Sequence, residues 1–132
     1  MKFHNGQEMT AEDAKFAIDY SMNPKNGARG FAELAIVDRA EARDKYTLNI
    51  HLKRSAPGFI YALARIETFS VVPKESVAEG MRNPGKFPPG TGPFKFVEWQ
   101  PQQRILFERF ADYWGHKAHV DRAILRIIGD TT

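Results

Sequence analysis

The chain has 132 residues, of which 42% are hydrophobic, 27% charged and 12% aromatic, values close to those of folded globular proteins. No apolar run approaches the roughly 20 residues of a membrane-spanning helix, and the absence of cysteine excludes disulfides, thiolate nucleophiles and cysteine-ligated zinc. The formal charge of +3 comes from cations that alternate with acids, as in residues 38–45, so the sequence predicts a solvated surface and no nucleic-acid partner.

The first strong element in chain order is a helix predicted over residues 11–22. Thr10 is a preferred N-cap residue, acids follow it in the first helical turn, and Pro24 ends the helix. Ahead of the helix, Phe3 is expected to end a strand before an Asn-Gly turn. We expect the helix to be covered on two sides, because its apolar residues form two ridges: Ala11, Ala14, Ile18 and Met22 on one, Phe16 and Tyr20 on the other.

The next two elements are predicted strands, at residues 34–43 and 46–53, after an exposed loop at residues 23–30. The second strand alternates between apolar and polar residues. This alternation predicts one buried sheet face and one solvated face. The residues of the expected buried face are Tyr46, Leu48, Ile50 and Leu52, and those of the solvated face are Thr47, Asn49, His51 and Lys53.

The second half of the chain predicts short helices and a strand-rich end. Pro57 suits the first turn of a helix over residues 58–64, and Pro73 opens another that runs through Ala78. Residues 79–93 are rich in glycine and proline and predict a long irregular crossing. A hairpin of residues 94–99 and 103–110, a strand at residues 120–128 and a helix N-cap at Asp130 complete the prediction.

No pattern of catalysis or metal binding emerges from the sequence. It holds no nucleophile elbow, phosphate-binding glycine loop or zinc helix, so we expect no enzymatic activity and no cofactor. His116 and His119 are two potential ligands, too few for a metal site without a third. We interpret Trp99, Tyr113 and Trp114 as packing residues at the edge of a core, because amphipathic aromatic side chains most often serve there.

Several segments taken together resemble one family. They are Thr10-Ala11-Glu12-Asp13-Ala14-Lys15-Phe16, Gly90-Thr91-Gly92-Pro93-Phe94, Val97-Glu98-Trp99 and Asp112-Tyr113-Trp114-Gly115. In this combination the chain resembles the family 5 solute-binding proteins of peptide and nickel ABC importers. The resemblance covers nearly all of residues 1–132.

The resemblance implies an α+β fold with mixed or antiparallel sheet and short helices, a subdomain of a periplasmic-binding-protein-like fold of type II, cluster C. Residues 1–132 are then expected to be one domain and part of the first lobe of a longer receptor. They would form mainly its smaller subdomain, with residues 90–132 returning toward the main lobe.

The implied function is capture of peptides, or of nickel chelates, sugars or opines, in the periplasm or another extracytoplasmic space, followed by delivery to an ABC permease. Contact with the membrane would come only through the permease or a lipid anchor. The family approaches its ligand from the loop after the first helix, which points to Arg29 and Phe31. The alternative is a free-standing, non-catalytic interaction or sensor domain that reuses the fold. We also expect the chain to self-associate, at Phe3 and at residues 123–128.

Overall fold

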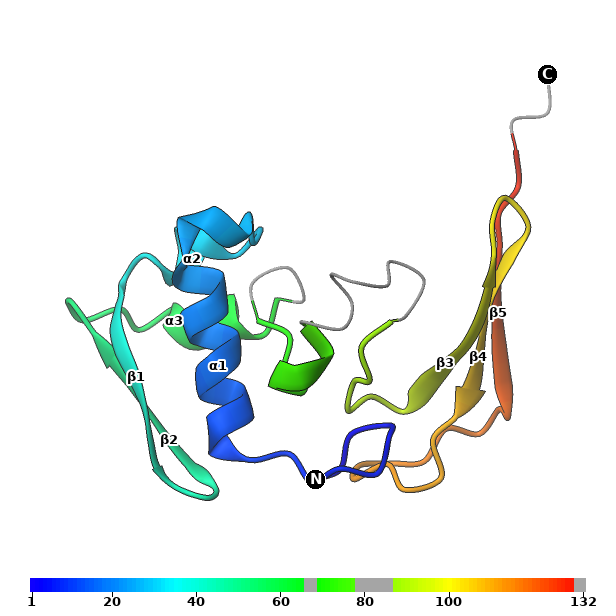
Figure 1. The fold of residues 1–132 in the computed structure, drawn as a ribbon, viewed down its shortest axis with the longest axis horizontal. Coiled ribbons are helices and arrows are strands. Elements are labelled where there is room, and N and C mark those ends of the chain that lie inside the picture. The colour runs from blue at the N-terminus through cyan, green and yellow to red at the C-terminus, as the bar shows by residue number, and fades with distance from the viewer. Residues whose placement is uncertain (66–68, 78–86, 130–132) are drawn as a thin grey trace.

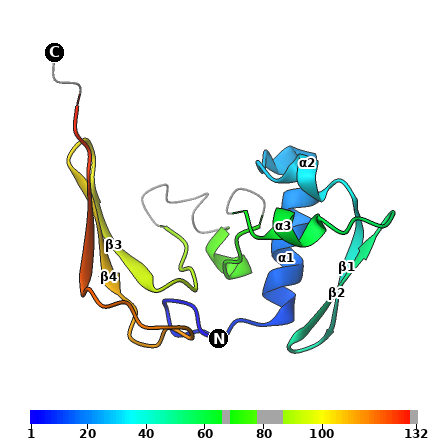
Figure 2. The ribbon, with the colours of Figure 1, turned by 180° about the vertical axis from the view of Figure 1, so that it is seen from behind.

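The computed structural model describes residues 1–65, 69–77 and 87–129. Figure 1 shows two groups of elements on either side of the N-terminal segment, and Figure 2 shows the same arrangement from behind. The first group contains α1 (Ala11–Met22), the 3-10 helix η1 (Pro24–Asn26), α2 (Phe31–Leu34), β1 (Val37–Asp44), β2 (Thr47–Leu52) and α3 (Phe59–Leu63). The second contains β3 (Phe94–Gln100), β4 (Arg104–Arg109) and β5 (Arg122–Arg126). Both sheets are antiparallel, which confirms the predicted α+β class.

Helix α1 has the predicted bounds because residues next to its two ends determine where it starts and stops. The Asp13 carboxylate accepts hydrogen bonds from the Thr10 N–H at 2.9 Å and from the Thr10 hydroxyl at 3.0 Å. Asp13 is 7% exposed, so these donors replace the water that its carboxylate loses on burial. Ala11, Ala14 and Ile18 are buried as predicted. Across the described residues, no helix has the length and apolar character needed to cross a membrane.

The Asp13 contact leads to a testable prediction. We expect Asp13→Ala to lower the free energy of unfolding by about 1 kcal/mol, because the Thr10 N–H loses its partner at the helix start. Glu12→Ala is the matched control, since Glu12 is an exposed acid in the same turn. Urea unfolding measures both variants. Equal losses in the two would show that only helix-dipole charge matters there and would refute the capping role.

The core of the first group lies between α1, α2 and the β1–β2 hairpin. Its buried centre is Ile18, Leu34, Val37 and Ala40, and Met22, Leu48, Ile50, Leu52, Phe59, Leu63 and Phe69 pack against it. Leu34 was expected to begin a strand, and this prediction is wrong. Residues 31–34 form one helical turn, in which the Leu34 N–H donates to the Gly30 carbonyl at 3.0 Å, and the strand begins only at Val37.

The β1–β2 hairpin turns at Asp44, whose Oδ1 accepts the backbone N–H groups of Tyr46 and Thr47, each at 2.9 Å. These bonds hold the pKa of Asp44 below its ordinary value. The alternation prediction is confirmed at Leu48 and Ile50, which pack on the core. It is wrong at Tyr46, which is 66% exposed, because Tyr46 lies in the turn and its hydroxyl reaches Glu8 at 2.8 Å instead.

The segment after β2 confirms the short helices in outline. Helix α3 begins after Gly58, close to the predicted start, and residues 74–77 are helical, as predicted for the helix that Pro73 opens. Pro73 itself is fully buried. Ala78 and most of the predicted crossing, together with Asp130, lie outside the described residues, while residues 87–92 contain no helix or strand.

The second group is an antiparallel sheet in the order β3-β4-β5. The hairpin that joins β3 to β4 is the predicted one, and Gln102 in its turn has a φ of 61°. Strand β5 is shorter than the predicted strand at residues 120–128. Pairing nevertheless continues past its end, where the Ile127 N–H donates to the Gln103 carbonyl at 2.9 Å.

This sheet has one apolar face and one charged face, which follow from the strand registers and the alternation of side chains. The apolar face carries Phe94, Phe96, Trp99, Ile105, Phe107 and Leu125. The charged face carries Lys95, Glu98, Arg104, Glu108, Arg122 and Arg126, with Leu106 and Ile124 between them. On the charged face Lys95 pairs with Glu108 at 2.7 Å and Arg104 with Glu98 at 2.8 Å.

Residues 1–9, called here the N-terminal clasp, join the two groups. On the side of the sheet, the His4 N–H donates to the Gly90 carbonyl at 2.9 Å and the His4 ring meets Phe110 edge to face at 5.0 Å. On the side of the hairpin, Glu8 pairs with Lys45 at 2.7 Å. The principal contacts between elements otherwise fall within one group or the other, so the clasp is a main link between them.

Phe3 is the buried centre of the clasp, with none of its surface exposed. Its N–H donates to the Gln7 carbonyl at 2.8 Å, and its carbonyl accepts the N–H of Gly6, which adopts a φ of 85° in the turn. Lys2 forms an isolated bridge with Glu8. The expectation that Phe3 is an exposed site of self-association is therefore wrong, because the folded clasp encloses its side chain.

Candidate functional site

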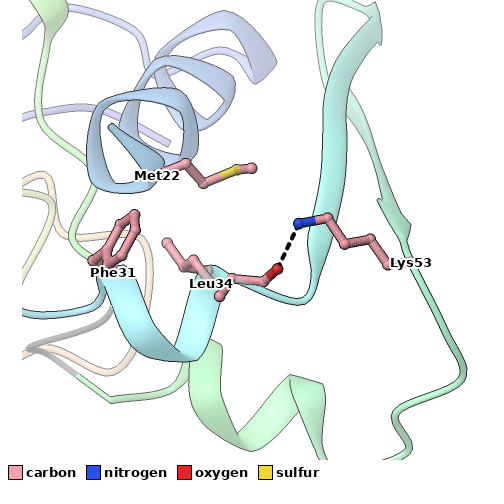
Figure 3. Close-up of a pocket in the computed structure, with 5 residues that line it drawn as sticks. Met22, Phe31, Leu34 and Lys53 are labelled. Carbon is pink, nitrogen blue, oxygen red and sulfur yellow. Dashed lines mark hydrogen bonds between the residues drawn. The ribbon is translucent and has the colours of Figure 1, made fainter. Parts of the chain in front are cut away.

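A small hollow opens where α1, α2 and the end of β2 meet (Figure 3). Met22 comes from the last turn of α1, Phe31 and Leu34 come from α2, and Ala35 and Lys53 complete the lining. Lys53 is held across the hollow because its ammonium donates to the Ala35 carbonyl at 2.8 Å. Its backbone N–H also donates to the Ile36 carbonyl at 2.9 Å, which fixes the chain at this point.

The chemistry of this hollow combines apolar walls with one cation. Its volume is about 140 Å³, close to that of an engineered apolar cavity, about 150 Å³, that binds benzene. Leu34 is fully buried at its base, whereas Phe31 is 41% exposed. The Lys53 ammonium forms no ion pair with a carboxylate of the described residues. The arrangement suits an apolar group of the size of a phenyl ring that lies beside a negative charge.

The two residues expected to contact a ligand differ in their placement. Phe31 lines the hollow, while Arg29 is exposed in the turn before α2 and is absent from its lining. The sequence did not predict Lys53 as a residue of this candidate site, since the alternation of apolar and polar residues assigned it only to the solvated face of its strand. It also missed the meeting of Met22 with Leu34, because these residues come from separate helices and no local pattern joins them.

A second, larger hollow of about 330 Å³ lies on the apolar face of the three-stranded sheet. Phe87 covers part of this face, with its ring centroid 4.4 Å from that of Phe96 and 6.1 Å from that of Trp99. His4 closes one end, where its Nε2 lies 3.0 Å from the Gly92 carbonyl. Among the described residues that line this hollow there is no acid, lysine or arginine, so these residues offer mainly apolar contact. The residues that line it are His4, Phe87, Pro88, Gly90, Phe94, Phe96, Ile105 and Phe107.

The three aromatic residues that were interpreted as packing residues lie at the margin of the three-stranded sheet and its flanking segments. Trp99 is 47% exposed on the apolar face of the sheet. Tyr113 and Trp114 contact each other with ring centroids 5.4 Å apart, and the Trp114 indole N–H donates to the Thr91 carbonyl at 3.2 Å. Trp114 thus attaches the segment after β4 to the loop before β3, which agrees with a packing role.

Charged side chains elsewhere on the described surface form local pairs. The hydrogen bond from Lys45, together with that from the Tyr46 hydroxyl, lowers the pKa of Glu8. The hydrogen bond from Lys95 likewise lowers the pKa of Glu108. Among the described residues, no group of three histidine, aspartate or glutamate side chains could hold a metal ion.

The sequence profile of the bacterial extracellular solute-binding proteins, family 5 (middle), matches residues 1–132. The chain belongs to this family. A Brucella ovis protein provisionally named an ABC transporter peptide-binding protein is 32% identical over 134 residues, which cover 98% of this chain and 25% of that protein. Glutathione-binding protein GsiB of Pectobacterium atrosepticum is 32% identical over 114 residues, which cover 86% of this chain and 22% of GsiB.

The solved structures agree with this membership. The binding protein AgaA of A. tumefaciens R10, in complex with agropinic acid, matches with a TM-score of 0.88 and 31% identity, over 95% of this chain and 26% of AgaA. NikZ of Campylobacter jejuni, in complex with nickel and L-histidine, matches with a TM-score of 0.82 and 26% identity, over 96% of this chain and 26% of NikZ. The expected family and the periplasmic-binding-protein-like fold are confirmed. So is the expectation that the chain is not an enzyme, since the family binds solutes.

The family match also shows how much of a full-length relative this chain covers. The chain spans about a quarter of the length of the curated relatives and solved structures that it matches. Both hollows described above lie within this quarter, and Lys53 is a cation in the lining of the smaller one.

Proposed function

We propose that this chain is part of an extracytoplasmic receptor that captures a peptide or a related small solute and delivers it to an ABC permease. The observation that carries the proposal is the family match over residues 1–132, joined to a TM-score of 0.88 with a solute-bound receptor. Relatives named for peptides and for glutathione, and structures named for an opine and a nickel complex, support a small polar solute as the cargo.

The proposal assigns a place in the receptor to each group of elements. The first group, built on α1 and the β1–β2 hairpin, would be most of a smaller subdomain of the first lobe. The three-stranded sheet, in residues 90–132, would lead back toward the main lobe. The separation of the two groups in the structure supports this division, as does the amphipathic sheet, whose apolar face is suited to packing against further chain.

Within the receptor, we assign to Phe31 and Arg29 a contact with the solute. The hollow beside Phe31 would take one apolar side chain of a peptide, and the Lys53 ammonium at its rim would face a carboxylate of the same ligand. Arg29 is exposed two residues before Phe31 and adds a second positive charge on this side of the molecule. An anionic peptide with a large apolar residue is therefore the favoured cargo.

The proposal is tested with the complete product of the gene that encodes this chain. Thermal shift against short peptides, glutathione, opines and nickel–histidine identifies the stabilising solute, and titration calorimetry gives its dissociation constant. A solute present at about 100 times its dissociation constant stabilises the protein by about 2.7 kcal/mol. We expect at least one peptide to do so, and the absence of any stabilising solute would overturn the receptor assignment.

Variants then locate the site. Phe31→Ala is expected to weaken binding by about 5- to 30-fold, which corresponds to roughly 1–2 kcal/mol. The matched control is Ile60→Ala, another exposed apolar residue on a short helix, at 65% exposure and outside the hollow. Solute binding that is unchanged in Phe31→Ala would refute the assigned contact and leave the receptor function intact.

A further inference from the structure

The turn of the N-terminal clasp is the asparagine–glycine pair Asn5-Gly6. The clasp is a small hairpin, in which the Phe3 N–H donates to the Gln7 carbonyl at 2.8 Å and the Gly6 N–H donates to the Phe3 carbonyl at 2.9 Å. Asn5 and Gly6 are both exposed in this turn. An asparagine that precedes glycine is prone to lose the ammonia of its side-chain amide, because glycine has no Cβ to crowd its own backbone nitrogen.

The reaction needs water and no other reactant. The Gly6 nitrogen loses its proton to hydroxide and attacks Cγ of Asn5, and Nδ2 takes a proton from water and leaves as ammonia. The product is a cyclic imide that contains the Gly6 nitrogen. Water then adds across one of the two bonds between this nitrogen and a carbonyl carbon, its hydroxyl to the carbon and its proton to the nitrogen. Cleavage at Cγ leaves aspartate, and cleavage at the main-chain carbonyl leaves isoaspartate, in which the chain continues through Cβ and Cγ.

The hydrogen bonds of the Asn5 side chain favour the first step. Its Oδ1 accepts the Gln7 N–H at 3.0 Å, and this bond closes a ring of atoms that includes the Gly6 nitrogen. The side-chain carbonyl is therefore held beside the nitrogen that attacks it. The same N–H points at the oxygen on which negative charge develops during the attack, so it acts as an oxyanion donor. The leaving Nδ2 is open to water, since its bond to the Gln7 Oε1 is 3.4 Å long and exposed.

The second asparagine–glycine pair, Asn26-Gly27, provides an internal comparison. Asn26 is half-buried, and its Nδ2 donates to the Tyr20 carbonyl at 2.9 Å, which holds the leaving nitrogen against the end of α1. The backbone N–H of the glycine must leave a carbonyl in both pairs, at 2.9 Å for Gly6 and 3.4 Å for Gly27. The pairs thus differ chiefly in their side chains, and one net hydrogen bond corresponds to about 2- to 12-fold in rate.

We propose that Asn5 is a site of spontaneous modification, where displacement of ammonia by the Gly6 nitrogen converts the residue to aspartate or isoaspartate. The two products differ in what they do to the clasp. Aspartate keeps the path of the chain, and its carboxylate can still accept the Gln7 N–H. Isoaspartate adds an extra atom to the main chain of the turn, and the length of a turn fixes the pairing of the two arms of a hairpin. Phe3, which is fully buried, then loses the turn that encloses it.

Mass spectrometry of the complete gene product tests the site. The protein is incubated at mildly alkaline pH and digested, and the amide-to-acid mass change is followed in the peptides that contain Asn5 and Asn26. The change is expected at Asn5, about 2- to 12-fold faster than at Asn26. The two rates are expected to converge in concentrated guanidinium chloride, where the folded contacts are lost. Asn5→Gln, whose longer side chain forms the imide far more slowly, is the control. No change at Asn5, an equal or faster rate at Asn26, or a difference that persists in denaturant would overturn the proposal.

Hydrogen exchange tests the consequence for the clasp, and its outcome depends on no solute, so it stands apart from the test of the receptor assignment. The aspartate and isoaspartate forms of one peptide elute separately in chromatography, so deuterium uptake is read for each form in a single aged sample. The Asn5→Asp variant identifies the aspartate peptide. The clasp is expected to take up deuterium faster in the isoaspartate form, because its hydrogen-bonded turn is lost. Equal uptake in the two forms would overturn the assigned effect on the clasp.

Discussion

Phe3→Ala is expected to lower the free energy of unfolding by about 3–5 kcal/mol, as large-to-small changes of buried aromatic residues do. None of the Phe3 surface is exposed, and the side chain fills the centre of the N-terminal clasp. Natural domains are stable by only about 5–15 kcal/mol, so this loss removes a large share of the total. Because the clasp contacts both the β1–β2 hairpin and the sheet, we expect backbone amides of both groups to lose protection from hydrogen exchange.

Phe31→Ala is the control for this prediction, since it removes the same side chain from a position that is 41% exposed. Its loss is expected to be clearly smaller. Denaturant unfolding measures both variants, and exchange is read at the amides of α1 and β4. Similar losses for Phe3→Ala and Phe31→Ala would show that the clasp contributes little to stability, contrary to the burial of Phe3.

Ile18→Ala is expected to cost about 2–5 kcal/mol, because it opens a cavity in the centre of the first group. Ile18 is fully buried and packs with Leu34 and Val37. The exchange protection of α1, β1 and β2 is expected to fall first, since they supply residues of this core, whereas β3, β4 and β5 supply none of the described residues that pack in it.

Ile60→Ala removes the same atoms from a helix position that is 65% exposed, and its effect on unfolding is expected to lie within about 0.5 kcal/mol. Thermal unfolding, followed by circular dichroism, compares the two isoleucine variants. A loss in Ile18→Ala no greater than that in Ile60→Ala would contradict the assignment of Ile18 to the core.

The functional assignment and the fold prediction depended on different signals in the sequence. The family was visible in short sequence segments, of which the Thr10 helix start and the Gly90 to Phe94 segment are examples, and the family match confirmed it. Phe31 was named from that resemblance, and the structure places it in a hollow. The place of Lys53 beside the hollow could not be predicted from sequence, because it depends on the position of the Ala35 carbonyl, which a separate turn of the chain provides.

Local chemistry in the sequence determined where α1 and the β3–β4 hairpin begin and end. These signals act on residues within a few positions, so they can be recognised in the sequence without knowledge of the fold. They are the N-cap at Thr10, Pro24 after the helix and the turn before Arg104. Tertiary structure alone decided that Phe3 is enclosed, that Leu34 ends a helix and that Tyr46 faces solvent. Contacts between distant residues take part in each case: His4 of the clasp bonds to Gly90, Leu34 packs with Ile18, and the Tyr46 hydroxyl bonds to Glu8. A pattern of neighbouring residues carries no information about such contacts.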